Sequence, residues 1–461
     1  MGFAIDGLVS GLDTTSMIES LMKVEANPQA LLVQKKTNAE KVLTALQALN
    51  TKVASLADAA KAAAKASSWD VRKATSSSDS VVATAAAGAA VGTVSFSVDA
   101  VAASQISLAD PFGDPADLLA GSPSLTLRAA DGTLTEITPE KPDWASITKA
   151  INDSDSGVKA TAVRVSDGEP PKFRLQLTGT KTGTTSSFEL FAGTSAQVVA
   201  AEVQPLKLGV VRAASDAQIT LWKGTDVAVS FQQPSNTFTG LLSGVDVTVA
   251  KVTKVDDAPV TVTVGQDDAA VKKLASDLVS QLNLVLSEVT SRTSTTTTTD
   301  SSGKTVVTGG LLSGDSATRA LQQTLISAGS RPVDGLSPST AGIELGRDGT
   351  FTFNATKFAE LLASDPAAAQ RMVAGVAAAV DEVASSTSDK IDGSLTQKIT
   401  NHESSIKTMG EQISDWDRRL EVRRSGLQRQ WSALEVTLSN LNSQQSWLTS
   451  QLASLSGSSG K

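Results

Sequence analysis

The feature that most constrains this chain is a regular spacing of apolar residues near its start. Between residues 39 and 63 they recur at alternating steps of three and four. This period of 3.5 residues is typical of a coiled-coil seam rather than of the broader face of a globular helix. As a helix the stretch would be about 37 Å long. Because its apolar stripe is narrow, it needs a partner helix.

The end of the chain supplies a candidate partner with the same rhythm. Apolar residues follow it from Ile399 to Leu420, and it resumes after a four-residue step to Trp431, beside Gly426. Such a stutter locally relaxes a supercoil. We therefore predict that the two ends pair through a seam that comprises Val42, Leu46, Leu49, Val53, Leu56, Ile406, Met409, Ile413, Trp416 and Leu420.

The middle of the chain changes to a period of two, which is typical of strands. Alternating apolar residues occupy positions 93–98, 245–249 and 260–264, and Asp-Gly pairs at 131–132 and 167–168 indicate turns. Helical patterns return at 268–289, 311–328 and 356–380. The Ser/Thr-rich stretch 293–308 is predicted to be a flexible loop.

We interpret this order as an α+β multidomain fold. Terminal helices form a coiled-coil or helical-bundle stalk, and small antiparallel β domains are inserted at its distal end. The predicted parts are terminal helical segments 1–40 and 430–461, poorly ordered alone; a helical stalk domain, 41–80 and 266–429; an inner β domain, 81–109 and 212–265; and an outer variable β-rich domain, 110–211.

Composition excludes much catalytic chemistry. The chain has no Cys, no Tyr and one His, His402, so thiolate nucleophiles, disulfides and Cys-containing metal sites are excluded. His402 falls on the seam at heptad spacing and is interpreted as a packing residue. We expect no cofactor and no metal. A loop at 152–157 superficially resembles a calcium loop, but Val163 stands where the bidentate glutamate should be.

A serine acyl-enzyme is the alternative from a different class. Ser146 and Lys149 form S-x-x-K, and residues 181–183 read Lys-Thr-Gly. These elements are too close together for the helical domain that normally separates them. An enzyme of this class would use Ser146 or His402, and our prediction is that the chain is not an enzyme.

The charge pattern argues against nucleic acid as a partner. The formal net charge is −8, and the densest basic cluster, at 418–429, is interleaved with Asp415, Asp417 and Glu421. A salt-bridged solvent face is the better interpretation. No classical signal peptide and no run of 18 apolar residues is present, so we expect no membrane insertion.

Several ordered motifs resemble those of a known family. Residues 5–14 read IDGLVSGLDT, 236–249 read NTFTGLLSGVDVTV and 309–321 read GGLLSGDSATRAL. Together with 341–353 they resemble the bacterial flagellar filament-capping proteins, the hook-associated protein 2 family. Residues 110–211 show little similarity to it.

The resemblance implies a structural, non-enzymatic protein at the distal tip of the flagellar filament. Such proteins form a ring of about five copies, retain exported flagellin and promote its folding and insertion. The implied partners are further copies of itself, flagellin, hook–filament junction proteins, an export chaperone and the type III export apparatus. The implied location is extracellular, reached without a cleaved signal peptide.

Docking on flagellin or junction subunits is expected from the terminal stripes. The candidates are Leu12, Ile18, Leu21, Met22, Leu434, Leu438, Leu441, Leu448 and Leu452. The closest alternative is another axial flagellar protein, either flagellin or a hook–filament junction protein. Adhesin activity of the outer domain could coexist with the capping role.

Overall fold

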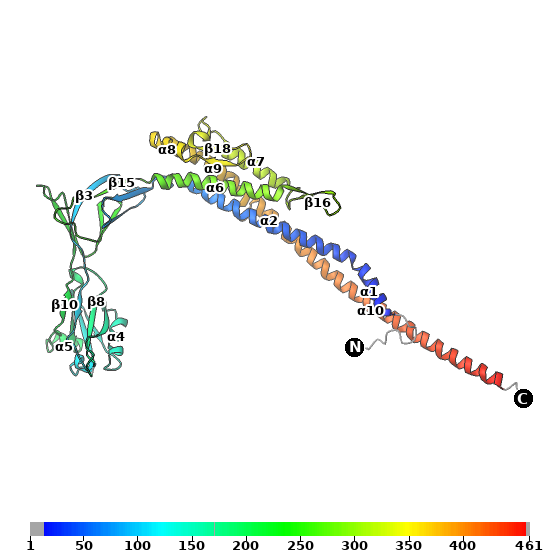
Figure 1. Ribbon diagram of the computed structural model, residues 1–461, viewed down its shortest axis with the longest axis horizontal. Coiled ribbons are helices and arrows are strands. Elements are labelled where there is room, and N and C mark those ends of the chain that lie inside the picture. Colours follow the sequence, from blue (N-terminus) through cyan, green and yellow to red (C-terminus); the bar gives the residue numbers. More distant parts are fainter. Residues whose placement is uncertain (1–12, 170, 458–461) are drawn as a thin grey trace. The chain divides into compact units, whose positions relative to one another are not determined.

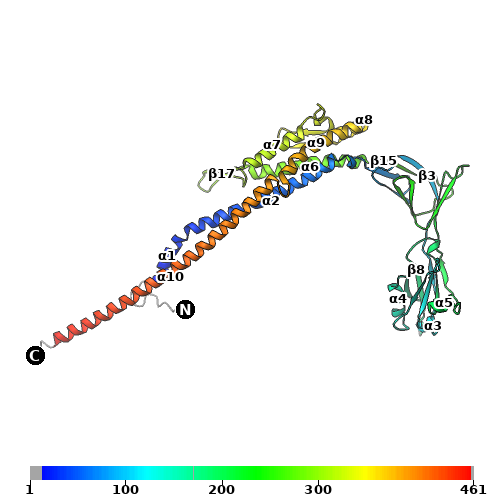
Figure 2. The same cartoon turned by 180° about the vertical axis from the view of Figure 1, so that it is seen from behind.

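The computed structural model describes residues 13–169 and 171–457. The chain divides into two compact units, one that joins the residues up to 68 to those from 272 onward, and one that comprises residues 69–271. Helices dominate the first unit and small antiparallel sheets the second (Figures 1 and 2). The predicted α+β multidomain fold, with long terminal helices around inserted sheets, is confirmed.

Two helices open the described chain. Helix α1 (Thr14–Glu25) is capped by Asp13, whose carboxylate accepts a hydrogen bond from the Ser16 N–H at 2.8 Å. Helix α2 (Asn27–Ala64) begins directly afterwards, with Pro28 in its first turn. Proline fits there because the first-turn N–H groups have no intrahelical acceptor. The predicted helix at 39–63 therefore forms the larger part of α2.

The chain returns to the helical unit through five further helices. They are α6 (Asp268–Thr293), α7 (Ser316–Ser330), α8 (Ala355–Ser364), α9 (Pro366–Ser388) and α10 (Ser394–Gly457). The single helix expected at 356–380 is in fact two. Pro366 cannot continue the preceding helix, and the Asp365 carboxylate caps α9 by accepting from the Ala368 N–H at 2.9 Å.

Helix α2 packs against both α9 and α10. A core of side chains with little or no exposure lies among these helices, and includes Leu46, Leu49, Val53 and Leu56 of α2, Leu282 and Val285 of α6, Leu325 of α7, and Val373 and Val380 of α9. Three single-turn 3-10 helices occur elsewhere in the described part of the chain, at Ala66–Ser68, Thr184–Ser186 and Pro338–Ala341.

The flexible loop predicted at 293–308 was wrong. This stretch forms an antiparallel hairpin of β16 (Thr295–Thr299) and β17 (Thr305–Gly309). Consecutive β-branched threonines favour extended backbone. In the turn, Asp300 Oδ1 accepts from the Ser302 and Lys304 N–H groups, each at 2.9 Å. A second hairpin, β18 (Ile343–Leu345) with β19 (Phe351–Phe353), turns at Asp348-Gly349.

The inner part of the β unit is a sandwich of two antiparallel sheets. One has the order β1 (Arg72–Ser76), β15 (Val260–Gln266), β3 (Gly92–Ala100), β11 (Ala217–Leu221), β12 (Val229–Gln233). The other has the order β13 (Thr237–Leu242), β14 (Val245–Val249), β2 (Val81–Ala85). Their shared core, the inner core, includes Phe96, Val98, Ile219, Val247 and Val262.

The outer part has its own sheets and core. One sheet has the order β10 (Gly209–Arg212), β4 (Ile106–Leu108), β8 (Phe173–Gly179), β7 (Val158–Arg164). The other has the order β6 (Leu134–Ile137), β5 (Leu125–Ala129), β9 (Phe188–Ala192). Short helices α3 (Pro115–Leu119), α4 (Trp144–Asp153) and α5 (Ser195–Val199) accompany them. The outer core includes Leu118, Leu125, Ile147, Ile151 and Leu175.

The pairing of strands bears on where each β domain begins. Strand β1, before residue 81, pairs within the inner sheet, and β4, before residue 109, pairs within the outer one. The domain bounds given above remain a prediction.

Candidate assembly surfaces

The two ends of the chain form an antiparallel helix pair. Arg423 Nε donates to Glu25 Oε1 at 3.0 Å, Gln29 Nε2 to Asp417 Oδ1 at 2.5 Å, and Gln47 Nε2 to Glu403 Oε1 at 3.3 Å. In each pair the two residue numbers add to between 446 and 450. This constant register means that α1 and α2 run along one face of α10 (Figure 1).

The predicted seam residues lie in two environments. By the register, Val42 is level with Ile406, and both are half-buried, as are Met409, Ile413, Trp416 and Leu420. Two paired helices alone cannot enclose a seam fully, whereas Leu46 and Leu49 are fully buried where further helices join. Val53 and Leu56 lie at or beyond the level at which α10 begins. They are buried where α9 packs along α2, in the region of the Lys61–Asp381 ion pair.

His402 lies half-buried on α10, one turn from Ile406. By the register it is level with Leu46 of α2. Its neighbour Glu403 is bound to Gln47 from across the pair. His402 therefore lies where a residue that packs between the two helices is expected.

Beyond the paired stretch, α10 extends past its partners. By the register, Asp13, the first described residue, is level with about residue 435. From there to Ala453 the apolar side chains are largely exposed: Leu434, Leu441, Leu448 and Leu452 are exposed and Leu438 is half-buried. Residues 436–460 contain no Asp, Glu, Lys or Arg. We call residues 436–453 of α10 the uncharged overhang.

The N-terminal docking candidates are placed differently. Ile18 and Met22 are buried within the chain, where α1 contacts α10, whereas Leu21 is exposed. Leu12 lies outside the described residues. A shallow groove of about 730 Å³ runs between α1 and α10, lined by Met22, Ala26, Leu420 and flanking polar residues that include Arg424.

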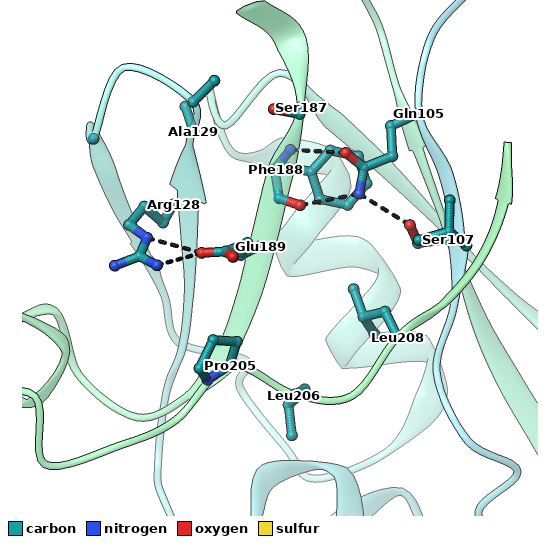
Figure 3. A pocket seen from close by; sticks show the side chains of 13 residues that line it. Gln105, Ser107, Arg128, Ala129, Ser187, Phe188, Glu189, Pro205, Leu206 and Leu208 are labelled. Carbon is teal, nitrogen blue, oxygen red and sulfur yellow. Dashed lines mark hydrogen bonds and ion pairs between the residues drawn. The ribbon is translucent and has the colours of Figure 1, made fainter. Parts of the chain in front are cut away.

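The outer β part contains a pocket of about 760 Å³ (Figure 3). Gln105 lies at its wall, where its Oε1 accepts from the Phe188 N–H at 2.9 Å and its Nε2 donates to the Phe188 carbonyl and to Ser107 Oγ, each at 3.0 Å. Arg128 of β5 is ion-paired with Glu189, directly opposite it on the neighbouring strand β9, and both line the same pocket (Figure 3). These polar groups satisfy one another, so the arrangement fits a structural role in joining β4 to β9.

The residues of the acyl-enzyme alternative do not form a nucleophile–base pair. Lys149 is ion-paired with Asp153 one turn along α4. Ser146 lies in the first turn of α4, where its N–H donates to Asp143 Oδ1 at 2.7 Å and so lowers the pKa of that carboxyl.

The side-chain amide of Asn152, in the calcium-like loop, exchanges two hydrogen bonds with the Ala160 backbone. Within residues 13–169 and 171–457, no cluster of three or more His, Cys, Asp or Glu could hold a metal ion.

The basic cluster on α10 is partly paired. Arg418 is bound to Asp415, Arg423 to Glu25, and the Arg419 guanidinium lies 5.6 Å from the Trp416 ring centroid. The ion pairs of Arg418 and Arg423 are consistent with the salt-bridged face predicted from the sequence. For the described part of the chain, no helix combines the length and apolar character needed to cross a bilayer.

Comparison with known proteins decides the family. The model of the flagellar hook-associated protein 2 C-terminus matches residues 214–443, and that of its N-terminus matches residues 10–105. The chain belongs to the flagellar hook-associated protein 2 family. The resemblance seen in the sequence motifs is thereby confirmed, and the chain is a flagellar cap protein of this family.

Relatives cover almost the whole chain. The B-type flagellar hook-associated protein 2 of Pseudomonas aeruginosa PAO1 is 26% identical over 98% of this chain and 95% of its own length. That of Escherichia coli K12 is 25% identical over 98% of each. The solved D1-D2-D3 domains of the Escherichia coli flagellar cap protein FliD share the fold, with a TM-score of 0.56 at 22% identity over 78% of this chain and 99% of that one. The family implies a location at the tip of the flagellar filament.

Proposed function

We propose that this hook-associated protein 2 family member retains exported flagellin at the filament tip and promotes its folding and insertion during elongation. It acts as a ring of about five copies and reaches the tip through the flagellar type III export apparatus with an export chaperone. It contacts flagellin and hook–filament junction proteins. Its role is structural and involves no catalysis.

The observation that carries the proposal is the uncharged overhang of α10. An isolated amphipathic helix gains little stability without burial of its apolar face. The exposed Leu441, Leu448 and Leu452 continue a seam rhythm that has no facing helix among the described residues. A helical partner, supplied by the terminal segments of axial flagellar subunits, would complete that seam. Exposed Leu21 is the N-terminal candidate for the same contact.

Removing residues 430–461 tests this proposal. We expect the deletion to abolish filament growth in cells, while the β unit at 69–271 remains folded by near-UV circular dichroism. A finer variant replaces Leu441, Leu448 and Leu452 with Gln, and the matched control replaces Ser443 and Ser450 of the same helix with Ala. Filaments of normal length from the deletion or the leucine variant would contradict the proposal.

A second candidate is another axial flagellar protein, either flagellin or a hook–filament junction protein. The antiparallel pair of terminal helices around a β insertion favours this class of architecture as well. Copy number separates the candidates, because a filament protein polymerises without limit whereas a cap stops at a closed ring. Mass photometry of the purified protein should show one closed oligomer, and open-ended polymers would favour the alternative.

A further inference from the structure

Strand β12 is an edge of the five-stranded inner sheet with an uncovered apolar face. It pairs with β11 in regular antiparallel register, which places Val229 opposite Leu221 and Phe231 opposite Ile219. Directly opposed residues in such a pair point to the same face of the sheet. Leu221 and Ile219 belong to the inner core, so Val229 and Phe231 point to that face too.

These two side chains are nevertheless open to solvent. Val229 is 44% exposed and Phe231 42%, whereas Ile219 beside them is 0% exposed. None of the residues described in β12 belongs to the inner core. The core face of the five-stranded sheet is therefore covered as far as β11, whereas the same face of β12 is not covered by the opposite sheet of the sandwich.

The turn that leads into β12 also carries exposed apolar side chains. Trp222 is 51% exposed and holds a left-handed backbone conformation at φ 50°, which is uncommon for a non-glycine residue. The Thr225 N–H and hydroxyl both donate to its carbonyl, at 3.1 and 2.8 Å, and fix this turn. Val227, in the turn, is also largely exposed.

Three other edge strands of this unit carry protection that β12 lacks, whereas the edge strand β2, which reads VVATA and is paired regularly, resembles β12 in this respect. Strand β1 has Arg72 and Lys73, β7 has Lys159 and Arg164, and the pairing of β10 is irregular. Charges and irregular pairing at an edge discourage addition of a further strand. Residues 227–233 read VAVSFQQ, without charge or proline. Strand β12 therefore has no charge or proline that would oppose contact with another chain.

We propose that the β12 surface, formed by Trp222, Val227, Val229 and Phe231, is the contact by which one copy of this chain binds the next. The inference deepens the proposed ring and rests on it. Each copy carries a formal net charge of −8, so copies repel one another and their contact is best built from uncharged surface. In a ring the contact is head-to-tail, and the neighbour presents a different surface to β12.

The size of the surface limits the strength of a single contact of this kind. An aromatic side chain carries about 150–250 Å², so the exposed halves of Trp222 and Phe231 offer roughly 200 Å² together, to which the valines add. A stable two-body interface needs about 800 Å² per partner. The β12 surface alone would give a weak pairwise contact. Ring closure, in which each copy makes two such contacts, would make the assembly stable.

The test compares a double variant, Val229→Lys with Phe231→Lys, to wild type by mass photometry over a range of concentrations. We expect the lysine pair to raise the concentration needed for the closed oligomer at least tenfold. The matched control, Val307→Lys, places a lysine on the exposed strand β17 and should assemble as wild type does. Far-UV circular dichroism and thermal unfolding establish that each variant is folded.

Two results would overturn the inference in distinguishable ways. Assembly of the folded lysine pair at the wild-type concentration would overturn the β12 contact and leave the ring intact. Wild-type protein that stays monomeric at every concentration would overturn the ring together with this contact.

A photocrosslink keeps the inference testable should the lysine pair fail to fold. Full-length protein with Phe231→p-benzoyl-phenylalanine is irradiated in the presence of flagellin. A covalent dimer of this chain is the expected product. Crosslinking to flagellin alone would assign the surface to that partner and overturn the copy-to-copy contact.

Discussion

At the residue scale, a nearly buried carboxylate ties two helices together in the helical unit. Glu288 of α6 accepts from Lys52 Nζ of α2 at 2.5 Å and from Arg292 Nε at 2.7 Å. These hydrogen bonds from Lys52 and Arg292 hold the pKa of the Glu288 carboxyl below its ordinary value. The ionised carboxylate is therefore more stable in the folded chain than in the unfolded one.

This arrangement predicts acid sensitivity of the helical unit. Because the folded pKa is lowered, the stabilisation from Glu288 is complete above its ordinary pKa of about 4.5 and is lost as pH falls through the folded value. Glu288→Gln should lower the free energy of unfolding at pH 7 by about 1–3 kcal/mol. It should also flatten the decline of stability below about pH 5. Urea unfolding from pH 3 to 7 measures both.

The control for this prediction is Glu411→Gln, at an exposed position of α10. A variant of Glu288 with the same pH profile as wild type would refute the role given to its carboxylate. The contact itself could not be predicted from the sequence. Lys52 and Glu288 are 236 positions apart, and no periodic pattern places one opposite the other.

At the scale of elements, the long helix α10 contains a glycine where alanine would fit. A Cβ built on Gly410 would have the Lys36 Cε at 3.7 Å as its nearest neighbour, an ordinary van der Waals contact. Glycine inside a helix costs about 0.5–1 kcal/mol relative to alanine. Gly410→Ala should therefore raise the free energy of unfolding by about that amount, measured by urea unfolding of the full chain.

The opposite effect is expected at Gly342, which serves as the control. Its φ is +75°, and a Cβ there would lie 2.4 Å from the Asn354 carbonyl oxygen. Gly342→Ala should destabilise the chain, because the backbone conformation and the close approach both exclude a side chain. Equal responses at the two glycines would show that the backbone argument is wrong.

Elements with a strong period were predictable and those with a weak one were not. The three/four rhythm predicted the helices that became α2 and α10, since their seams face partners along much of their length. The hairpin at β16 and β17 was missed because a run of threonines and serines carries no apolar alternation. The position of β12 at the edge of its sheet could not be predicted from the sequence for a different reason. Residues 227–231 alternate as a strand should, but whether a strand lies at a sheet edge depends on neighbours far away in the sequence.

At the scale of the whole molecule, the chain enters and leaves the β unit through adjacent strands. Strand β1, which follows its first residues, pairs with β15, which precedes its last, and Arg72 lies opposite Gln266. Both β cores are complete within residues 69–271. The nesting of the β unit between two helical ends was predictable from the order of the patterns. The sheet orders inside it were not, since strand pairing joins residues far apart in the sequence, as when β3 pairs with β15.

This closure predicts that residues 69–271 fold as an isolated fragment. We expect a β-rich circular dichroism spectrum, a cooperative thermal transition and dispersed NMR amide signals. The control is a fragment of residues 110–204, which lacks strands β4 and β10 of the outer sheet and should fold poorly. A disordered 69–271 fragment would show that the helical unit is needed to fold the sheets.

The antiparallel register of α10 also means that the length of the uncharged overhang sets how far α10 extends beyond its partner helices. Residues of α10 up to about 435 are matched to residues of α1 and α2, whereas those beyond have no counterpart among the described residues. Seven residues inserted beyond that point would lengthen the single helix by about 10 Å and keep the phase of its apolar stripe. The matched pair and the helical core would be unchanged. The part of α10 up to about residue 435 therefore stabilises the fold, and the overhang beyond it sets how far the helix extends. Evolution can change the length of the overhang without disturbing the packing of the helical unit.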